Sequence, residues 1–227
     1  MPFPALAERV AEVKGRIAAA VARGGHGQRV TVVAVTKTHG PDAARAAYQA
    51  GLHDVGENKV QEALKKMSAV DVPVRWHLIG HLQRNKVKAL EQFVLLHSLD
   101  SARLADAVCA YGIARGRAVD ALLELNLSGE ATKGGFSAAE LLPEAERLVA
   151  RPGIRVRGVM TMASFTATDV ELHHTFAEAR DALRVLVGAG HPAEELSMGM
   201  SNDYEIAVEE GATMVRLGTT LFGARDK

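Results

Sequence analysis

Apolar runs and helical patterns alternate along almost the whole sequence. Residues 30–35 form a nearly continuous apolar and β-branched run, which is typical of a strand that is buried on both faces. Shorter runs of the same kind recur at residues 53–55, 75–79, 93–97, 118–127, 155–162, 195–198 and 213–217. The pattern therefore predicts eight strands.

Helical patterns lie before the first predicted strand and between the later ones. The segments with helical spacing or helix-start signals are residues 5–23, 41–50, 58–67, 86–91, the stretch after Ser101, 137–149 and 169–187. Strands that alternate with helices pair in parallel through crossovers, so the sequence predicts an α/β fold. We interpret it as a single (β/α)8 TIM-type barrel with an extra N-terminal helix, and we expect residues 1–227 to form one domain. An open doubly wound sheet is the alternative.

Composition and charge exclude several classes of protein. The sequence has 27 Lys and Arg against 27 Asp and Glu and no long basic run, which argues against binding to nucleic acid. One cysteine, Cys109, cannot form an internal disulfide, which suits a reducing cytoplasm. The first residues lack the order of a signal peptide, and charges recur too often for a membrane span. We therefore expect a cytoplasmic protein that binds neither nucleic acid nor membranes.

In a parallel barrel, functional residues gather at the carboxyl ends of the strands. Lys37 follows the first apolar run, where the barrel would enclose its aliphatic stem. Desolvation disfavours the ammonium form and leaves the amine free to attack a carbonyl group. The alternative is a lysine that begins a solvated loop and points outward.

Two segments near the end of the sequence resemble an anion-binding site. Asn202 lies three residues before Glu205 in an N-cap pattern, and Gly218 opens a short helical turn. Many barrels bind phosphate with the loops after strands seven and eight, although ordinary helix capping explains the same residues. Arg216, in the last strand, points either into the barrel or toward the helices. A carbonyl-reactive lysine, a phosphate site and an inward arginine together suggest pyridoxal 5′-phosphate (PLP).

A metal-binding site has little support in the sequence. His77 and His81 lack a third ligand at metal-binding spacing, so we predict no metal site. We assign no catalytic residue.

At these same positions the sequence resembles a known family, the pyridoxal phosphate homeostasis proteins. The resemblance extends in order over nearly the whole chain. Its motifs are VTKT at residues 35–38, GENKVQE at 56–62, WHLIGHLQRNK at 76–86, HSLD at 97–100, RGVM at 157–160, LSMGMSND at 196–203, MVRLGT at 214–219 and FGAR at 222–225.

The resemblance implies a barrel like the N-terminal domain of alanine racemase, with PLP held as a Schiff base. It assigns the cofactor-binding role to Lys37, Asn58, His77, Met200, Ser201, Arg216, Gly218 and Thr219. Of these, Lys37 would carry the Schiff base, Arg216 would lie beside the pyridine nitrogen, and Ser201, Gly218 and Thr219 would contact the phosphate. Two positions depart from the family pattern: Lys59 replaces a common aromatic residue, and the loop containing Gly134 and Gly135 has glycine where serine is usual.

The resemblance also implies a protein of PLP (vitamin B6) homeostasis without an established reaction. Alanine racemase needs a second domain that supplies a tyrosine, and this sequence stops at Lys227, about ten residues after its last predicted strand. We expect a monomer that carries PLP without catalysing a reaction and passes it to apo PLP-dependent enzymes. The alternatives are a PLP-dependent racemase or lyase acting on amino acids, and a Schiff-base aldolase that uses Lys37 without a cofactor.

Overall fold

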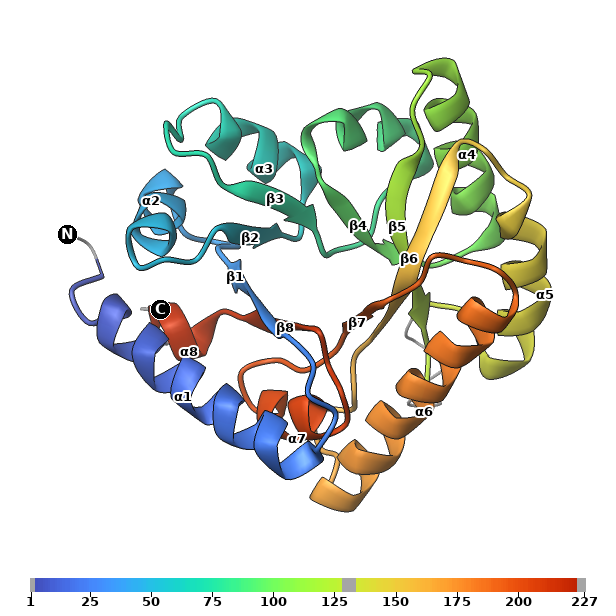
Figure 1. Cartoon of the computed structure of the whole chain (residues 1–227). Helices are drawn as coiled ribbons and strands as arrows, with labels where there is room; N and C mark the ends of the chain where they lie inside the picture. Colours follow the sequence, from blue (N-terminus) through green and yellow to red (C-terminus); the bar gives the residue numbers. More distant parts are fainter. Residues whose placement is uncertain (1–2, 128–133, 224–227) are drawn as a thin grey trace.

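The computed structural model describes residues 3–127 and 134–223, and its centre is a closed barrel of parallel strands (Figure 1). The strands follow one another around the barrel in sequence order, and β8 pairs with β1 to close it. Their bounds are β1 Thr31–Val35, β2 Asp54–Glu57, β3 Arg75–Leu78, β4 Leu95–Leu99, β5 Val119–Leu125, β6 Ile154–Thr161, β7 Glu195–Ser197 and β8 Met214–Leu217. The predicted (β/α)8 barrel is confirmed, and the doubly wound sheet is excluded.

Helices cover the outside of the barrel before β1, between most of the strands and after β8 (Figure 1). They are α1 Leu6–Gly24, α2 Pro41–Gln49, α3 Val60–Met67, α4 Ala102–Ala114, α5 Ala138–Val149, α6 Asp169–Gly188, α7 Tyr204–Glu209 and α8 Thr219–Phe222. The predicted extra N-terminal helix is α1. Ion pairs such as Arg16 with Glu205, and a hydrogen bond at 3.1 Å from Arg9 Nη1 to the carbonyl oxygen of Leu221, attach it to α7 and α8.

Several elements differ from the sequence prediction in type or bounds; strand β2, for example, is Asp54–Glu57 rather than residues 53–55. The helix expected over residues 86–91 is a 3-10 helix, η1 Arg84–Gln92. Strand β4 begins two residues later than predicted. The prediction follows the apolar Phe93 and Val94, which lie before the strand, whereas the polar His97 and Ser98 lie within it.

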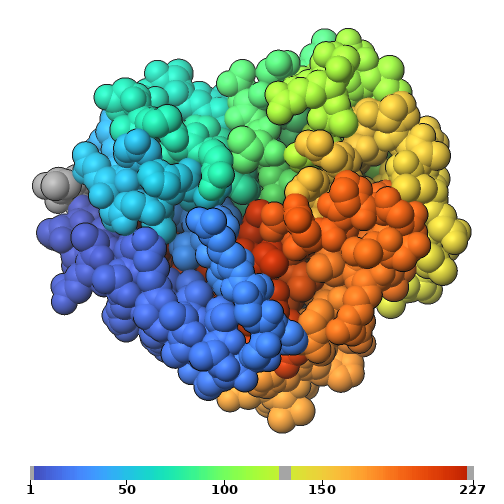
Figure 2. All heavy atoms as spheres, in the orientation of Figure 1, coloured from blue at the N-terminus to red at the C-terminus, as the bar shows by residue number. Residues whose placement is uncertain are grey.

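Two apolar layers enclose the barrel wall. Outside the wall, strand residues such as Val32, Ala34 and Leu78 pack in the main core with the helices. Inside the barrel lies a smaller cluster of Leu95, Leu122, Met160 and Met214, with Met162 packed against it. The space-filling view shows C-terminal segments (red) at the centre of one face, between N-terminal segments (blue) and α6 (orange) (Figure 2).

No helix in the described ranges 3–127 and 134–223 has the length and apolar character that crossing a membrane requires.

Candidate functional site

Lys37 lies two residues after the end of β1 and is half-buried. The next residue, Thr38, has a φ of 70°, which is a strained left-handed conformation for a β-branched side chain. The turn is closed by a hydrogen bond at 3.0 Å from the backbone N–H of His39 to the carbonyl oxygen of Thr36. This short, strained turn fixes the backbone of Lys37 at the carboxyl end of the barrel.

A buried ion pair supports the same turn from outside the barrel wall. Lys66 Nζ, on α3, donates to Glu57 Oε1 at 2.5 Å and to the carbonyl oxygen of Thr36 at 2.6 Å. The Thr36 hydroxyl also donates to Glu57, whose side chain is fully buried. Sequence reasoning missed this pair. The available signal was a carboxylate at the end of a buried strand, followed by a helix that contains lysines.

The loops after β7 and β8 meet where the phosphate site is predicted. Ser201 Oγ accepts a hydrogen bond at 3.3 Å from the backbone N–H of Thr220, and the Thr220 hydroxyl donates to the Ser201 carbonyl oxygen at 3.4 Å. Gly218 is the N-cap residue of α8, and Thr219 is its first residue. The structure therefore brings Ser201 to the first turn of α8, with the half-buried Met200 next to it in sequence.

The predicted helix cap at Asn202 is wrong. Helix α7 begins at Tyr204, and its N-cap residue is Asp203. The reason is that the Asp203 carboxylate turns back and accepts a hydrogen bond from the backbone N–H of Met200 at 2.5 Å. Burial raises the pKa of Asp203, although this hydrogen bond and the charge of Arg216 oppose the shift.

Arg216 lies inside the barrel, which resolves the choice that the sequence left open. Its side chain is 4% exposed. Nη1 donates to the carbonyl oxygen and to Oγ of Ser197, both at 2.7 Å, and Nη2 donates to the carbonyl oxygen of Thr161 at 2.9 Å. Burial lowers the pKa of Arg216 to about 10, so the guanidinium remains protonated at neutral pH.

His77 also lies in the barrel interior, and both of its ring nitrogens have partners. Nε2 is 2.8 Å from Asp54 Oδ1, and Nδ1 is 2.8 Å from His97 Nε2. His97 Nδ1 is in turn 2.8 Å from Ser197 Oγ. Sequence reasoning gave no role to Asp54, His97 or Ser197. The available signal was a set of polar residues inside apolar strands.

The electrostatics of these buried groups follow from their surroundings. Burial places the pKa of His97 well below 6.5, and the charge of Arg216 adds to this shift. Burial opposes ionisation of Asp54, but hydrogen bonds from His77 and Arg75 outweigh it and lower the pKa of that carboxyl group. His97 is therefore neutral and Asp54 ionised at neutral pH.

Asn58 follows β2 and is half-buried beside the loop after β3. A Cβ atom at Gly80 would lie 2.4 Å from the Asn58 carbonyl oxygen, so these two loops approach each other closely at a glycine. Lys59 points away on the rim, where its side chain is 71% exposed and its Nζ lies 3.0 Å from Glu62 Oε1. The first departure from the family pattern is therefore a solvated ion pair.

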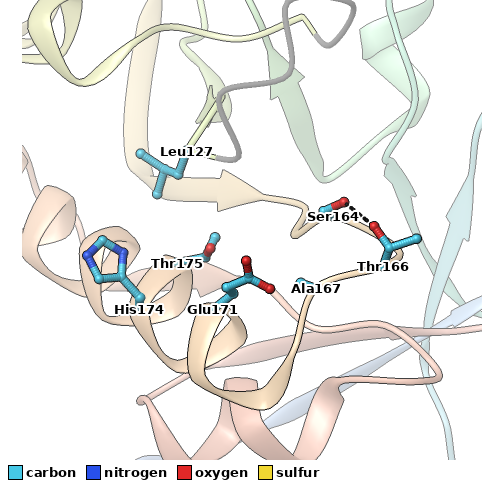
Figure 3. Close-up of a pocket in the computed structure, with 7 residues that line it drawn as sticks. All are labelled: Leu127, Ser164, Thr166, Ala167, Glu171, His174 and Thr175. Carbon is cyan, nitrogen blue, oxygen red and sulfur yellow. Dashed lines mark hydrogen bonds between the residues drawn. The ribbon is translucent and has the colours of Figure 1, made fainter.

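A surface pocket of about 430 Å³ lies at the start of α6, and neither Lys37 nor Arg216 is among the residues that line it (Figure 3). One of its polar groups, the Glu171 carboxylate, already caps α6 by accepting from the Thr168 N–H at 2.7 Å. Its lining residues are Leu127, Ser164, Thr166, Ala167, Glu171, His174 and Thr175.

No group of three or more His, Cys, Asp or Glu residues in the described part of the chain is arranged so that it could hold a metal ion. Gly134 and Gly135, the second departure from the family pattern, are described, but the preceding residues 128–133 of that loop lie outside the described residues.

The fold first defines a class of protein. The sequence matches the family described as alanine racemase, N-terminal domain, over residues 11–226. An alanine racemase from Corynebacterium glutamicum matches the structure with a TM-score of 0.76 at 16% sequence identity, over 97% of this chain and 61% of that one. At this level of identity the match shows the shared fold.

Within that class, the chain belongs to the family of pyridoxal phosphate homeostasis proteins. It is 41% identical over 224 residues to the pyridoxal phosphate homeostasis protein of Aquifex aeolicus, covering 96% of this chain and 97% of the relative. It also matches the structure of PipY from Synechococcus elongatus, solved with PLP bound. That match has a TM-score of 0.84 and 36% identity, over 96% of this chain and all (100%) of PipY.

Proposed function

We propose that this protein binds PLP at the carboxyl end of the barrel, holds it as a Schiff base on Lys37, and serves intracellular PLP homeostasis. The observation that carries the proposal is Arg216. It is a buried cation whose hydrogen-bond partners in the described structure are two backbone carbonyl oxygens and one hydroxyl. These three bonds use three of its five N–H donors, so donors remain for a ligand inside the barrel.

The residues present fit the three functional groups of PLP. Lys37 provides an amine for the aldehyde, and Ser201 with the first turn of α8 provides a hydroxyl and backbone N–H groups for the phosphate. Arg216 provides a donor for the pyridine nitrogen, while Asn58 and Met200 would line the pocket. PLP supplies an electrophilic carbonyl and, in enzymes, an electron sink.

Arg216 favours a carrier over an enzyme. A guanidinium can only donate hydrogen bonds, so the pyridine nitrogen facing it stays unprotonated and the ring withdraws electrons less strongly. Such a ring stabilises carbanions poorly, which disfavours the carbanion intermediates of transaminases. We propose that the protein catalyses no reaction on amino acids and passes PLP to apo PLP-dependent enzymes.

The positions of the tyrosines also support a carrier. The Tyr204 hydroxyl is buried without a hydrogen-bond partner among the described residues. Tyr111, on α4, donates to Glu91 Oε2 at 2.9 Å, and Tyr48, on α2, packs edge-on against His53. A two-base racemase needs a second acid or base facing the cofactor. Tyr48 and Tyr111 are engaged elsewhere, and Tyr204 packs in the main core with the helices, so we propose that none of the three provides one.

Three further parts of the proposal rest on the sequence. We propose that residues 1–227 form one domain, that the protein is a monomer, and that it resides in the cytoplasm. The described barrel extends from residue 31 to residue 217, and the single cysteine, Cys109, is buried as a free thiol.

The test of the function is the visible absorption spectrum after incubation with PLP. We expect a Schiff-base band in the wild-type protein and in Lys59→Ala, whose lysine is solvated on the rim, but not in Lys37→Ala. A Lys37→Ala protein with the wild-type band would refute the assignment of Lys37. A wild-type protein that stays colourless would favour the cofactor-free aldolase, and α-proton exchange on amino acids would favour the enzyme.

A further inference from the structure

A row of buried polar side chains crosses the barrel interior from β2 to β8. We call it the barrel network, and its members are Asp54, His77, His97, Ser197 and Arg216. Successive members are joined by hydrogen bonds of 2.7–2.8 Å. Each member is at most 6% exposed, so water cannot substitute for a missing partner without entering the barrel.

The hydrogen positions in the network follow from its two ends. Arg216 can only donate, so Ser197 Oγ accepts from it, and we assign the hydrogen of the hydroxyl to the bond with His97 Nδ1. At the other end, the Asp54 carboxylate can only accept, so His77 carries a hydrogen on Nε2.

Neutral His97 has a single N–H, which then lies on Nε2 and donates to His77 Nδ1. Every hydrogen in the network therefore points from the Arg216 cation toward the Asp54 anion.

We propose that His97 and Ser197 are positioning residues for Arg216, and that His77 acts on the cofactor site through this network rather than by touching PLP. Asp54 fixes the tautomer of His77, and His77 fixes that of His97. His97 in turn fixes the direction of the Ser197 hydroxyl. The network is a property of the protein alone, whereas its effect on PLP rests on the proposed function.

The geometry explains why Arg216 depends on the network. Ser197 supplies two of the three acceptors that hold the guanidinium, and one of them is the hydroxyl. A hydroxyl that rotated its hydrogen toward Arg216 would present a donor to a donor and lose this bond. His97 prevents the rotation because its Nδ1 offers the hydroxyl a buried acceptor. Loss of His97 would therefore loosen Arg216 although no hydrogen bond joins the two residues directly in the described structure.

The first experiment reads the tautomers of the unliganded protein. Long-range ¹H–¹⁵N correlation spectra of histidine-labelled protein at neutral pH distinguish a protonated ring nitrogen from a bare one. We expect the Nε2–H tautomer for both His97 and His77. An Nδ1–H tautomer of His97 would overturn the proposal whether or not PLP binds.

The second experiment measures PLP affinity in variants. Ser197→Ala and His97→Phe each remove a link, and we expect the dissociation constant to rise about tenfold, as for loss of one hydrogen bond to a charged group. Ser197→Thr retains the hydroxyl and should restore most of the affinity. The matched control is His191→Phe, because His191 is also buried but bonds the Ala145 carbonyl oxygen outside the barrel.

Wild-type affinity in both Ser197→Ala and His97→Phe would overturn the proposal, as would an equal loss in His191→Phe. A wild-type protein that forms no Schiff-base band at all would instead refute the proposed function and leave the tautomer assignment standing. The tautomer spectra use the unaltered protein, so they decide the question even where a variant fails to fold.

Discussion

Replacing Lys66 with methionine should destabilise the protein strongly. Methionine nearly matches the length of the lysine stem but lacks its charge. The substitution removes the hydrogen bonds from Nζ to Glu57 Oε1 at 2.5 Å and to the Thr36 carbonyl oxygen at 2.6 Å. The Glu57 carboxylate would remain fully buried, with only the Thr36 hydroxyl as a donor among the described contacts.

The magnitude follows from this burial. Removing one partner of a buried ion pair costs about 3–5 kcal/mol, because the other charge stays in a low-dielectric site. For a chain of this length, each kcal/mol lowers the melting temperature by about 2–4 °C, so Lys66→Met should lower it by about 6–20 °C. Replacing both partners by apolar residues, as in Glu57→Leu with Lys66→Met, should cost about 1–3 kcal/mol and less than Lys66→Met alone, because the buried Thr36 hydroxyl loses its acceptor but no unpaired charge remains.

Urea unfolding followed by tryptophan fluorescence measures these free energies. Trp76 is the single tryptophan, and it is buried on β3, so its emission reports loss of the barrel. The matched control is Lys59→Met. This residue also pairs with a glutamate across α3, but its side chain is 71% exposed, and the change should cost less than about 0.5 kcal/mol.

Two results would refute the reasoning about Lys66. One is a Lys66→Met variant whose free energy of unfolding falls by less than about 1 kcal/mol, comparable to an exposed pair. The other is a double variant less stable than Lys66→Met alone, which would mean that the Glu57 carboxylate is not the source of the cost.

Two further predictions concern packing and pH. Gly112→Ala should lower the free energy of unfolding by about 1–3 kcal/mol, because a Cβ atom there would lie 1.8 Å from the Gly153 carbonyl oxygen. Gly15→Ala, in an open helical position, should instead raise the free energy of unfolding by about 0.5–1 kcal/mol. Equal effects of the two substitutions in urea unfolding would contradict this prediction. His97 is neutral when folded and has a pKa well below the 6.5 of the unfolded chain, so its stabilising contribution is present above pH 6.5 and is lost as the pH falls below it. Unfolding measured from pH 7 to 5 should show a slope of up to about 1.4 kcal/mol per pH unit that is smaller in His97→Phe, and an unchanged slope would show that His97 does not titrate this way.

The sequence predicts most of the fold because burial leaves a clear pattern. Strand β1 is apolar at nearly every position, since one set of its side chains faces the helices while the other faces the barrel interior. Strand β4 shows where this reasoning fails. Its interior positions hold the polar His97, so hydrophobicity alone shifts the predicted strand toward Phe93 and Val94. The interior of this barrel is partly polar, and a hydrophobic pattern cannot locate such a strand accurately.

The sequence predicts those site residues that follow the ends of strands. It does not predict those whose position depends on contacts across the barrel. The position of Lys37 after β1 and the turn at Gly218 after β8 follow from the order of the elements. The contact of His97 with Ser197 joins β4 to β7 over 100 residues of sequence, and it depends on the register of every strand between them. The pairing of Lys66 with Glu57 likewise depends on how α3 packs on β2.

The most direct test of the central claim is borohydride reduction of the PLP-loaded protein, followed by peptide mapping of the labelled lysine by mass spectrometry. Reduction converts a Schiff base into a stable secondary amine, so the label marks the lysine that held the cofactor. We expect a phosphopyridoxyl group on Lys37, in a yield that matches the loss of the visible band. A label on exposed lysines such as Lys59, with Lys37 unmodified, would contradict it.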